Sequence, residues 1–499
     1  MAPTTIALSL VSHTNVGKTT LARTLLGRDI GEVRDAAHVT EAAEAHVLVE
    51  SATGDRLMLW DTPGFGDSLR LAKRLALAGN PIGWFLSEVW DRWRDRAFWS
   101  SQRALRNVLE QADVVLYLVN ASEAPEDAGY LDAELRVLAL IGKPVIVLLN
   151  QLGPAGAAAD GEAQQVERWA ARLHAAKGVH AVLPLDAFTR CWVQEGVLWQ
   201  AVASAVPVAH RLAFKRLRAA WHERQVATWR AAMAELARRL ARAALDREVA
   251  TSQGWRGSLR ALGTLLGLHD GDAGSASERA MAELAGRLDA DVRASTDELI
   301  RLHGLDGRAG DEVLRRLAHH YALRQPLNEG RAALWGGLVT GALAGLKADI
   351  ATGGLTLGGG LLAGGVIGAL TAAGAAHGVN RVRGLDQPVV AWDRSVLDGL
   401  LAAALLGYLA VAHHGRGRGA WVAQDPPAAW TAAVTQVLAE RASDMAALWQ
   451  QREALLAQAS AASKRDTDTL QQPLQALIGD LCVRLLQRLY PEASAVALG

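Results

Sequence analysis

The first 27 residues contain the pattern that most restricts the fold of this chain. The run "IALSLV" (6–11) is continuously apolar, and after a short loop Gly17, Lys18 and Thr19 open the helix-forming stretch "TTLARTLLG". An uninterrupted apolar run predicts a strand buried on both faces, as in a parallel sheet covered by helices. A strand, a glycine-containing loop and a helix in this order predict a phosphate-binding loop at the carboxyl end of the strand.

Each residue type in the predicted loop has a physical role. Gly17 lets the backbone approach phosphate groups, Lys18 neutralises the β and γ groups, and Thr19 holds Mg²⁺ through its hydroxyl. The N–H groups at the start of the helix add further donors. Ser12 stands where the usual pattern opens with glycine, and it costs backbone freedom only if that position requires a positive φ. The predicted phosphate cradle comprises Asn15, Val16, Gly17, Lys18, Thr19 and Thr20.

A second motif, "LMLWDTPGFGDS" (57–68), follows 43 positions after the lysine, counted from Lys18 to Asp61. Its apolar run predicts a strand that delivers Asp61 to the same edge of the sheet as the phosphate loop. A carboxylate there completes the Mg²⁺ shell, and the N–H of Gly64 is placed to sense a γ-phosphate. Together the two motifs predict a site for a magnesium-bound nucleoside triphosphate.

Six short apolar runs in residues 1–205 predict one mixed sheet. The second and third runs are separated by "SATGD" alone and predict an antiparallel hairpin, while the first, fourth and fifth predict buried parallel strands. We therefore expect an α/β fold with one mixed, mostly parallel sheet and one antiparallel edge pair. The runs are "IALSLV" (6–11), "AHVLVE" (45–50), "RLMLW" (56–60), "DVVLYLV" (113–119), "PVIVLL" (144–149) and "AVLPL" (181–185).

The strand signal ends at Pro207, and the remainder of the chain predicts helices. Two apolar stripes at helical spacing indicate core-facing seams. We expect a nucleotide domain (1–205), a helical region (206–330), a glycine-rich hairpin (331–380) and a C-terminal helical region (381–499). The stripes are Trp229, Met233, Leu236 and Leu240, and Leu474, Leu477, Ile478, Leu481 and Leu485.

Four stretches together resemble the Era- and TrmE-like GTPases: "SHTNVGKTT", "DTPGFGD", "ADVVLYLVN" and "KPVIVLLN". The resemblance implies a Ras-like P-loop GTPase fold that binds GTP and GDP with Mg²⁺. It places Asn150 and the adjacent Gln151 at the base, and Thr40 as the switch I threonine that reaches the metal and the γ-phosphate. This chain departs from the family at "NQLG" (150–153), where the family has Asn-Lys-x-Asp. The carboxylate that reads the guanine edge is missing, which weakens base discrimination. Asp186 is a candidate substitute.

The resemblance also implies how hydrolysis proceeds. Lys18, Thr40 and Gly64 are the expected catalytic residues, and Thr19, Thr40 and Asp61 the expected metal ligands. Phe65 stands where many GTPases have a glutamine that orients water, so we expect slow intrinsic hydrolysis. Asn15 matches an asparagine that in some relatives binds K⁺ beside the phosphates. Those relatives dimerise through their nucleotide domains, which makes a homodimer the partner arrangement to test.

A tryptophan-rich insert (79–100) follows the second motif. The chain from Asp61 to Asp113 is several times longer than the ~10–12 residues that a crossover needs. On a helical wheel the apolar residues share one arc, which predicts an amphipathic helix that packs on the protein's own helical part or, in the alternative, docks an effector protein. This insert and "LDAFTRCWVQE" also resemble a bacterial family with a C-terminal domain of unknown function 3482. The arc comprises Phe85, Leu86, Val89, Trp90, Trp93 and Ala97.

The segment 331–380 contains a glycine zipper, with glycines four residues apart in two series. The apolar runs 334–346, 360–376 and 399–412 span only ~20–26 Å at ~1.5 Å per residue, against a ~30 Å hydrocarbon core. A soluble or peripheral protein is therefore expected, and a nucleotide-gated hairpin that enters the membrane is the alternative. His413 and His414 are expected to lie in a loop. The zipper residues are Gly337, Gly341, Gly345, Gly360, Gly364 and Gly368.

Composition adds limits on function. The 52 basic and 52 acidic residues balance, so no nucleic-acid partner is predicted. Cys191 and Cys482, the two cysteines, lack the spacing of a zinc or disulfide framework, and no signal peptide is recognised at the N-terminus. We expect a cytoplasmic regulatory GTPase that acts on an unknown protein effector. The alternatives are a nucleotide-gated protein at the inner membrane and a scaffold that binds nucleotide without hydrolysis.

Overall fold

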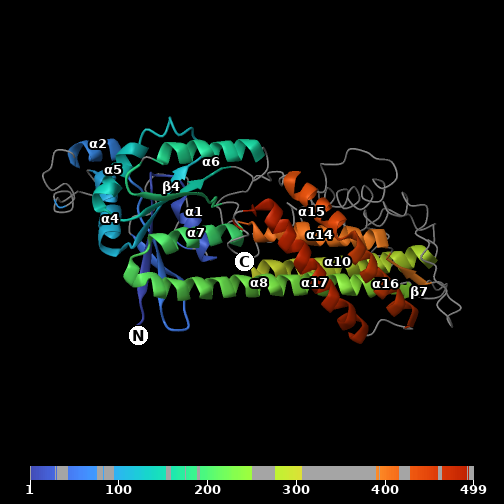
Figure 1. Cartoon of the computed structure of the whole chain (residues 1–499). Coiled ribbons are helices and arrows are strands. Elements are labelled where there is room, and N and C mark those ends of the chain that lie inside the picture. The colour runs from blue at the N-terminus through green and yellow to red at the C-terminus, as the bar shows by residue number, and fades with distance from the viewer. Residues whose placement is uncertain are drawn as a thin grey trace.

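The computed structural model describes two joined parts of the chain, an α/β part and a helical part (Figure 1). The described residues are 2–27, 30, 43–75, 83, 95–152, 159–174, 176–187, 191–249, 276–305, 389–392, 394–414, 428–458, 464–491 and 493. Thr40, the glycine zipper and most of the tryptophan-rich insert lie outside these residues, so the expectations for them stay predictions.

A six-stranded sheet forms the centre of the α/β part, in the order β2-β3-β1-β4-β5-β6. All neighbouring strands run parallel except β2, which pairs antiparallel with β3. This confirms the six predicted strands and the edge hairpin. The strands are β1 (Thr5–Ser12), β2 (Glu44–Glu50), β3 (Arg56–Asp61), β4 (Val114–Asn120), β5 (Val145–Asn150) and β6 (Val179–Pro184).

Helices cover both faces of this sheet, and alternate residues of each strand supply the two cores. In β4, Leu116 and Leu118 belong to one core, whereas Tyr117 and Val119 belong to the other. The first core receives α1 (Lys18–Leu26) and α7 (Trp192–Ala205). The second receives α2 (Ser68–Leu75), α4 (Arg96–Gln111), α5 (Leu131–Ile141) and α6 (Ala159–Leu173). The α/β fold predicted from the strand pattern is confirmed, and it is of the Ras-like type that the resemblance implies.

The helical part is built around α8 (Arg211–Leu245), which follows the short helix η1 (Val208–His210). At ~1.5 Å per residue its 35 residues span ~52 Å, and Figure 1 shows it running from beside the sheet along the helical part. Both predicted apolar stripes pack into the core, one on α8 and the other on α17. The other helices among the described residues are α10 (Ala276–Leu302), α14 (Arg394–Ala412), α15 (Ala428–Glu440), α16 (Ala442–Gln458) and α17 (Lys464–Leu489).

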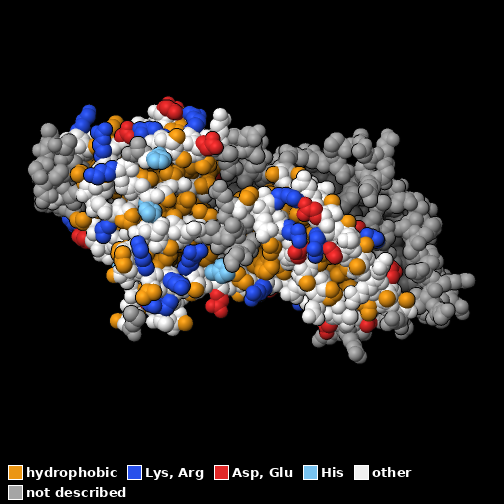
Figure 2. Space-filling model, in the orientation of Figure 1, with side chains coloured by type: hydrophobic (Ala, Val, Ile, Leu, Met, Phe, Trp, Pro, Cys, Tyr) orange, Lys and Arg blue, Asp and Glu red, His pale blue; other side chains and the backbone are white. Residues whose placement is uncertain are grey.

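One hydrophobic core continues from the sheet into the helical part. It includes Leu10 of β1, Trp199 of α7, Leu240 of α8 and Leu481 of α17, all at most 2% exposed. The connection is therefore packed rather than a free linker. Basic and acidic side chains both occur on the visible surface of the two parts in Figure 2, in agreement with the balanced charge of the chain.

Two expectations about the elements need correction, and one buried side chain was not expected. Strands do occur after Pro207: β7 (Arg247–Val249) and β8 (Val389–Ala391) pair antiparallel, and three residues are too few to show a strand period. His413 and His414 lie directly after α14, outside the helix as expected, but the His413 side chain is buried: it is 1% exposed and its ring lies 4.7 Å from that of Trp430. The predicted helix of the insert does not continue through Asp95, which caps the start of α4.

The described helices also bear on membrane crossing. None of them combines the length and the apolar character that a bilayer crossing requires.

Candidate nucleotide-binding site

The phosphate loop joins β1 to α1, and its backbone explains why glycine stands at position 17. Gly17 caps the start of α1 in the left-handed region, with φ 96° and ψ 28°. A Cβ atom built on this residue would lie 2.9 Å from Nδ2 of Asn150. Both the dihedral angles and the lack of space therefore require glycine here.

Ser12 causes no backbone strain in this loop. It is the last residue of β1 and pairs with Leu118 of β4, so its backbone is extended. Among the described residues other than glycine, positive φ values occur at Asn15 and Gln151, not at Ser12. The Ser12 hydroxyl donates to the carbonyl of His13 and accepts a hydrogen bond from Lys18 Nζ at 3.3 Å. The serine thus supports the lysine within an intact loop.

Lys18 and Asp61 lie close together in a buried environment, where they influence each other's ionisation. Burial lowers the pKa of Lys18, and the carboxylates of Asp61 and Glu134 oppose that shift. Burial also raises the pKa of Asp61, against the effect of Lys18 and of a hydrogen bond from Thr19. Each charge therefore depends on its partner, and a bound phosphate would provide a new partner for the lysine.

The same region contains oxygen atoms suited to a metal. Thr19 Oγ1 donates to Asp61 Oδ2 at 2.5 Å. The other carboxylate oxygen, Asp61 Oδ1, is buried and has no hydrogen-bond partner among the described residues. Mg²⁺ prefers carboxylate and hydroxyl oxygens of this kind. The two residues predicted as ligands thus fit the metal, while the third, Thr40, lies outside the described residues.

Residues 61–68, which we name the switch segment, run beside the phosphate loop. Thr62 Oγ1 donates to the carbonyl of Leu10 at 2.6 Å, and the N–H of Phe65 donates to the carbonyl of Ser12 at 2.9 Å. At Gly64 a Cβ would lie 3.1 Å from Cα of Thr14 and 3.2 Å from Nζ of Lys18. A side chain at this glycine would therefore have to push the segment and the loop apart by a few tenths of an ångström.

Asn150 connects three elements of the site. Its Nδ2 donates to the carbonyl of Val16 at 2.7 Å, and its Oδ1 accepts from the N–H of Ala187 at 2.8 Å. The side chain is fully buried, so it fixes the phosphate loop relative to the ends of β5 and β6. Gln151 follows with φ 61°, and Asp186 directly precedes the residue that Asn150 holds. The predicted contact of Asn150 with a base stays a prediction.

Comparison with known proteins supports this interpretation of the site. Residues 7–151 match the sequence model of a family described as 50S ribosome-binding GTPase. The N-terminal part of this chain is a P-loop GTPase domain. Among curated proteins, none matches the chain. The match does not extend past residue 151, so the resemblance to domain of unknown function 3482 stays a prediction.

Solved structures similar to this chain include two of Era at low identity. One, in complex with MgGDPNP and 16S ribosomal RNA, is 18% identical with a TM-score of 0.30, covering 41% of this chain and 58% of that chain. The other, an Aquifex aeolicus variant bound to GDP and AlF4⁻, is 19% identical with a TM-score of 0.29, covering 41% and 57%. Toc33 from Arabidopsis thaliana is 12% identical with a TM-score of 0.26, covering 38% and 72%. The chain thus spans less than two thirds of either Era chain.

Beyond its phosphate loop, the GTPase domain holds the switch segment against α4. Phe65, the residue expected at the position of the water-orienting glutamine, is 1% exposed and packs in the core between the sheet and α4 and α5. The N–H of Gly66 donates to Ser101 Oγ at 3.1 Å, and a Cβ on Gly66 would lie 2.5 Å from Ala97. The beginning of α4, which closes the tryptophan-rich insert, is therefore in direct contact with the switch segment.

Sequence reasoning missed one polar cluster of the GTPase domain. Glu134 of α5 is 1% exposed and bonds to His13, Ser68 and Tyr117. These residues come from four different elements or loops, and no local spacing relates them. The one available signal was an acidic residue within the apolar helical stretch "LDAELRVLALI", which is buried only when it has partners.

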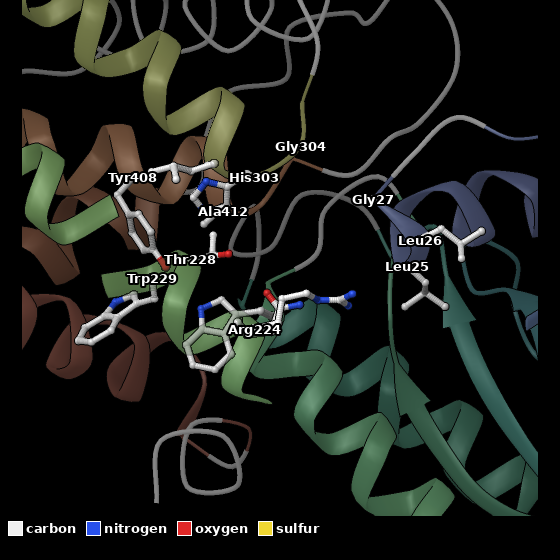
Figure 3. Close-up of a pocket in the computed structure, with 13 residues that line it drawn as sticks. Leu25, Leu26, Gly27, Arg224, Thr228, Trp229, His303, Gly304, Tyr408 and Ala412 are labelled. Atoms are coloured by element: carbon white, nitrogen blue, oxygen red, sulfur yellow. The ribbon is translucent and has the colours of Figure 1, made fainter. Parts of the chain in front are cut away.

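A separate cavity of about 230 Å³ lies between the GTPase domain and the helical part (Figure 3). Leu25 and Leu26 line it from α1, Arg224 and Thr228 from α8, and Tyr408 from α14. None of the predicted nucleotide-site residues is among its lining residues. The nucleotide site is therefore assigned to the loop between β1 and α1 and not to this cavity.

Proposed function

We propose that this protein is a regulatory GTPase that binds GTP with Mg²⁺, hydrolyses it slowly and changes its switch segment with nucleotide state. The observation that carries the proposal is the buried Oδ1 of Asp61 beside Thr19, which has no hydrogen-bond partner in the part of the chain that the structure describes. It lies next to a phosphate loop with a left-handed Gly17. A cation between Asp61, Thr19 and a triphosphate would satisfy that oxygen. Such a metal, when bound, neutralises charge on the phosphates.

Different residues of the site have different roles in binding the nucleotide. Lys18 binds the β- and γ-phosphates in place of its present carboxylate partners, and the backbone of Asn15–Thr20 supplies N–H donors. Gly64 brings its own N–H toward the γ-phosphate, a role supported by its close approach to Lys18 Nζ. Thr40 completes the metal shell. Because Phe65 is buried and offers no amide to orient water, intrinsic hydrolysis is slow.

Coupling to the helical part follows the contacts of the switch segment. Gly66 is held by Ser101 of α4, and α4 begins where the tryptophan-rich insert ends. A shift of the segment on hydrolysis therefore moves the insert, whose apolar arc would release or expose a surface for a protein effector. The sheet itself joins the core that holds Phe65 and α4 to the core that it shares with α8 and α17, which connects the two parts of the molecule.

Base choice and cation dependence are the finer features to establish. Gly153 occupies the position of the guanine-reading carboxylate, so we expect a smaller preference for GTP over ATP than in relatives with aspartate there. Asn15, with φ 65°, is the residue through which K⁺ would stimulate hydrolysis. The pair of phosphate loops brought together in a homodimer would complete such a cation site.

Binding titrations of GTP, ATP and GDP to the purified chain, with Mg²⁺, test the first step. Phosphate release is then compared between the parent and Lys18→Ala, in K⁺ and in Na⁺. We expect nucleotide binding by the parent, slow release that K⁺ accelerates, and loss of both in the variant. Equal release by parent and variant in both salts would exclude hydrolysis. Absence of binding by the parent would exclude the proposed function as a whole.

A further inference from the structure

Glu134 forms a buried junction between the two loops that surround the proposed nucleotide. Its Oε1 accepts a hydrogen bond from Nδ1 of His13 at 2.7 Å and another from the hydroxyl of Ser68. Its Oε2 accepts from the hydroxyl of Tyr117 at 2.6 Å. One carboxylate oxygen is thus shared by the phosphate loop and the switch segment.

The two residues that bond to Oε1 belong to different segments around the proposed nucleotide site. His13 is the first residue after β1, and its ring stacks on Tyr130 with centroids 4.3 Å apart and planes 14° from parallel. Ser68 is the last residue of the switch segment and the first of α2. A movement of either residue changes the environment of the same oxygen, so the positions of the loop and of α2 are energetically linked.

Burial makes this link strong. Glu134 is 1% exposed, and its hydrogen-bond partners are a histidine, a serine and a tyrosine rather than lysine or arginine. A buried carboxylate that loses one of its donors bears the full desolvation cost of the vacated site. Glu134 also acts on Lys18: burial lowers the pKa of the lysine, and the negative charge of Glu134 opposes that shift. Glu134 therefore interacts with the phosphate loop in two ways, through the hydrogen bond from His13 and through the charge of Lys18.

We propose that Glu134 is a positioning residue that makes the placement of Ser68 and α2 depend on the triphosphate held by the phosphate loop. The inference rests on the proposed function. With GTP, the switch segment stays against Lys18 and the Ser68–Glu134 bond is retained. With GDP, the segment is released and this bond is broken, so the bond contributes to the affinity for GTP and not to that for GDP.

The test compares affinities for a non-hydrolysable GTP analogue and for GDP in three variants with Mg²⁺. Ser68→Ala removes the switch-segment donor, and we expect about a tenfold loss of analogue affinity with GDP affinity within about twofold. Ser68→Thr retains a hydroxyl and restores the ratio of the two affinities. Tyr117→Phe removes the third donor, which belongs to neither loop, and lowers the melting temperature while leaving the ratio unchanged.

A double-mutant cycle asks whether the two loops communicate through the carboxylate. His13→Phe keeps a ring for stacking on Tyr130 but removes the donor to Glu134. Combined with Ser68→Ala, we expect a loss in the affinity ratio no larger than that of the stronger single variant, because both act through one group. Independent, additive effects would overturn the inference.

Other results of these experiments distinguish failure of this inference from failure of the proposed function. Equal loss of analogue and GDP affinity in Ser68→Ala, or a fall in melting temperature with an unchanged ratio, would reduce Glu134 to a structural role and overturn the inference. In both cases the parent still binds nucleotide and the proposed function stands. If the parent binds neither nucleotide, the proposed function itself fails.

Discussion

Gly17 and Gly27, at opposite ends of α1, allow the effect of backbone strain to be distinguished from the effect of crowding at the nucleotide site. Gly17 and Gly27 both adopt left-handed conformations, with φ 96° and 64°. A Cβ atom added to Gly27 would meet no neighbour within 4 Å, whereas one added to Gly17 would lie 2.9 Å from Asn150 Nδ2. A non-glycine residue would be strained at both positions, but only at position 17 would it also meet a neighbouring side chain. Gly27 is therefore a matched control for substitutions of Gly17.

Gly17→Ala and Gly27→Ala are both expected to lower the free energy of unfolding by roughly 1–2 kcal/mol, the usual penalty of a left-handed non-glycine residue. Gly17→Ala also displaces Asn150 and thereby the Val16 carbonyl, so it destabilises more and loses affinity for GDP. Urea unfolding and GDP titration measure the two effects. Unaltered GDP affinity in Gly17→Ala would contradict the geometry of the loop, and Gly27→Ala should keep that affinity.

The nucleotide-site residues differ in how far sequence could predict them. Lys18, Thr19 and Asp61 were predicted from local motifs and lie together, because parallel strands bring their carboxyl ends to one edge. Glu134 and its contact with His13 were not predicted. The two residues are 121 positions apart, and their meeting depends on how α5 packs against β4, which no short spacing records.

At the scale of elements, the length of a strand decides whether its sequence pattern can be recognised. The six sheet strands have six to eight residues and were all predicted, whereas the three-residue strands β7 and β8 were missed. The loop position of "HH" (413–414) was predicted and α14 does end at Ala412, but the burial of His413 was not predicted. That burial depends on Trp430 of α15 and on Tyr490, the residue after α17, which no spacing around His413 records.

The buried His413 predicts a pH dependence of stability. Burial lowers the pKa of His413 to about 4, although its hydrogen bond with the Leu409 carbonyl opposes the shift. The unfolded state, with an ordinary pKa of about 6.5, binds a proton first. Stability from the neutral ring is therefore complete above pH ~6.5 and is lost as pH falls toward 4, by at most about 3 kcal/mol.

Urea unfolding of the parent and of His413→Phe between pH 7 and pH 4.5 measures this effect. Phenylalanine retains a ring against Trp430 and Tyr490 but does not titrate, so the variant should lose less stability over that interval. The comparison depends on the slope with pH and not on the absolute stability of the variant. Parallel pH profiles would show that His413 is not the responsible group.

At the scale of the whole molecule, the junction between the sheet and α8 is the feature to test. Asp55, in the turn between β2 and β3, is 1% exposed and accepts two hydrogen bonds from Arg216 of α8, at 2.6 and 3.0 Å. This guanidinium, followed by the Thr4 N–H and the Thr53 and Ser51 hydroxyls, holds the pKa of Asp55 well below its usual range. The carboxylate therefore contributes stability above pH ~4, which is lost as pH falls further.

Because the sheet and the helical part share this ion pair and one hydrophobic core, a ligand on the phosphate loop should stabilise both. At a free concentration of 100 times Kd, a nucleotide adds about 2.7 kcal/mol to the free energy of unfolding of whatever unfolds with its site. We expect Mg²⁺ with GDP to slow proteolysis within α15, α16 and α17, which belong to the helical part and not to the GTPase domain. Asp55→Asn should weaken that remote protection while the loop still binds GDP.

Glu50→Gln is the matched control for Asp55→Asn, since Glu50 pairs with Arg56 on the same hairpin but both side chains are about half exposed. An exposed pair of this kind contributes little, so the control should keep remote protection and lose less than about 1 kcal/mol of stability. If GDP protects the GTPase domain and leaves cleavage of α15–α17 unchanged in the parent, the shared core does not transmit binding. The helical part would then respond only through the switch segment and the insert that follows it.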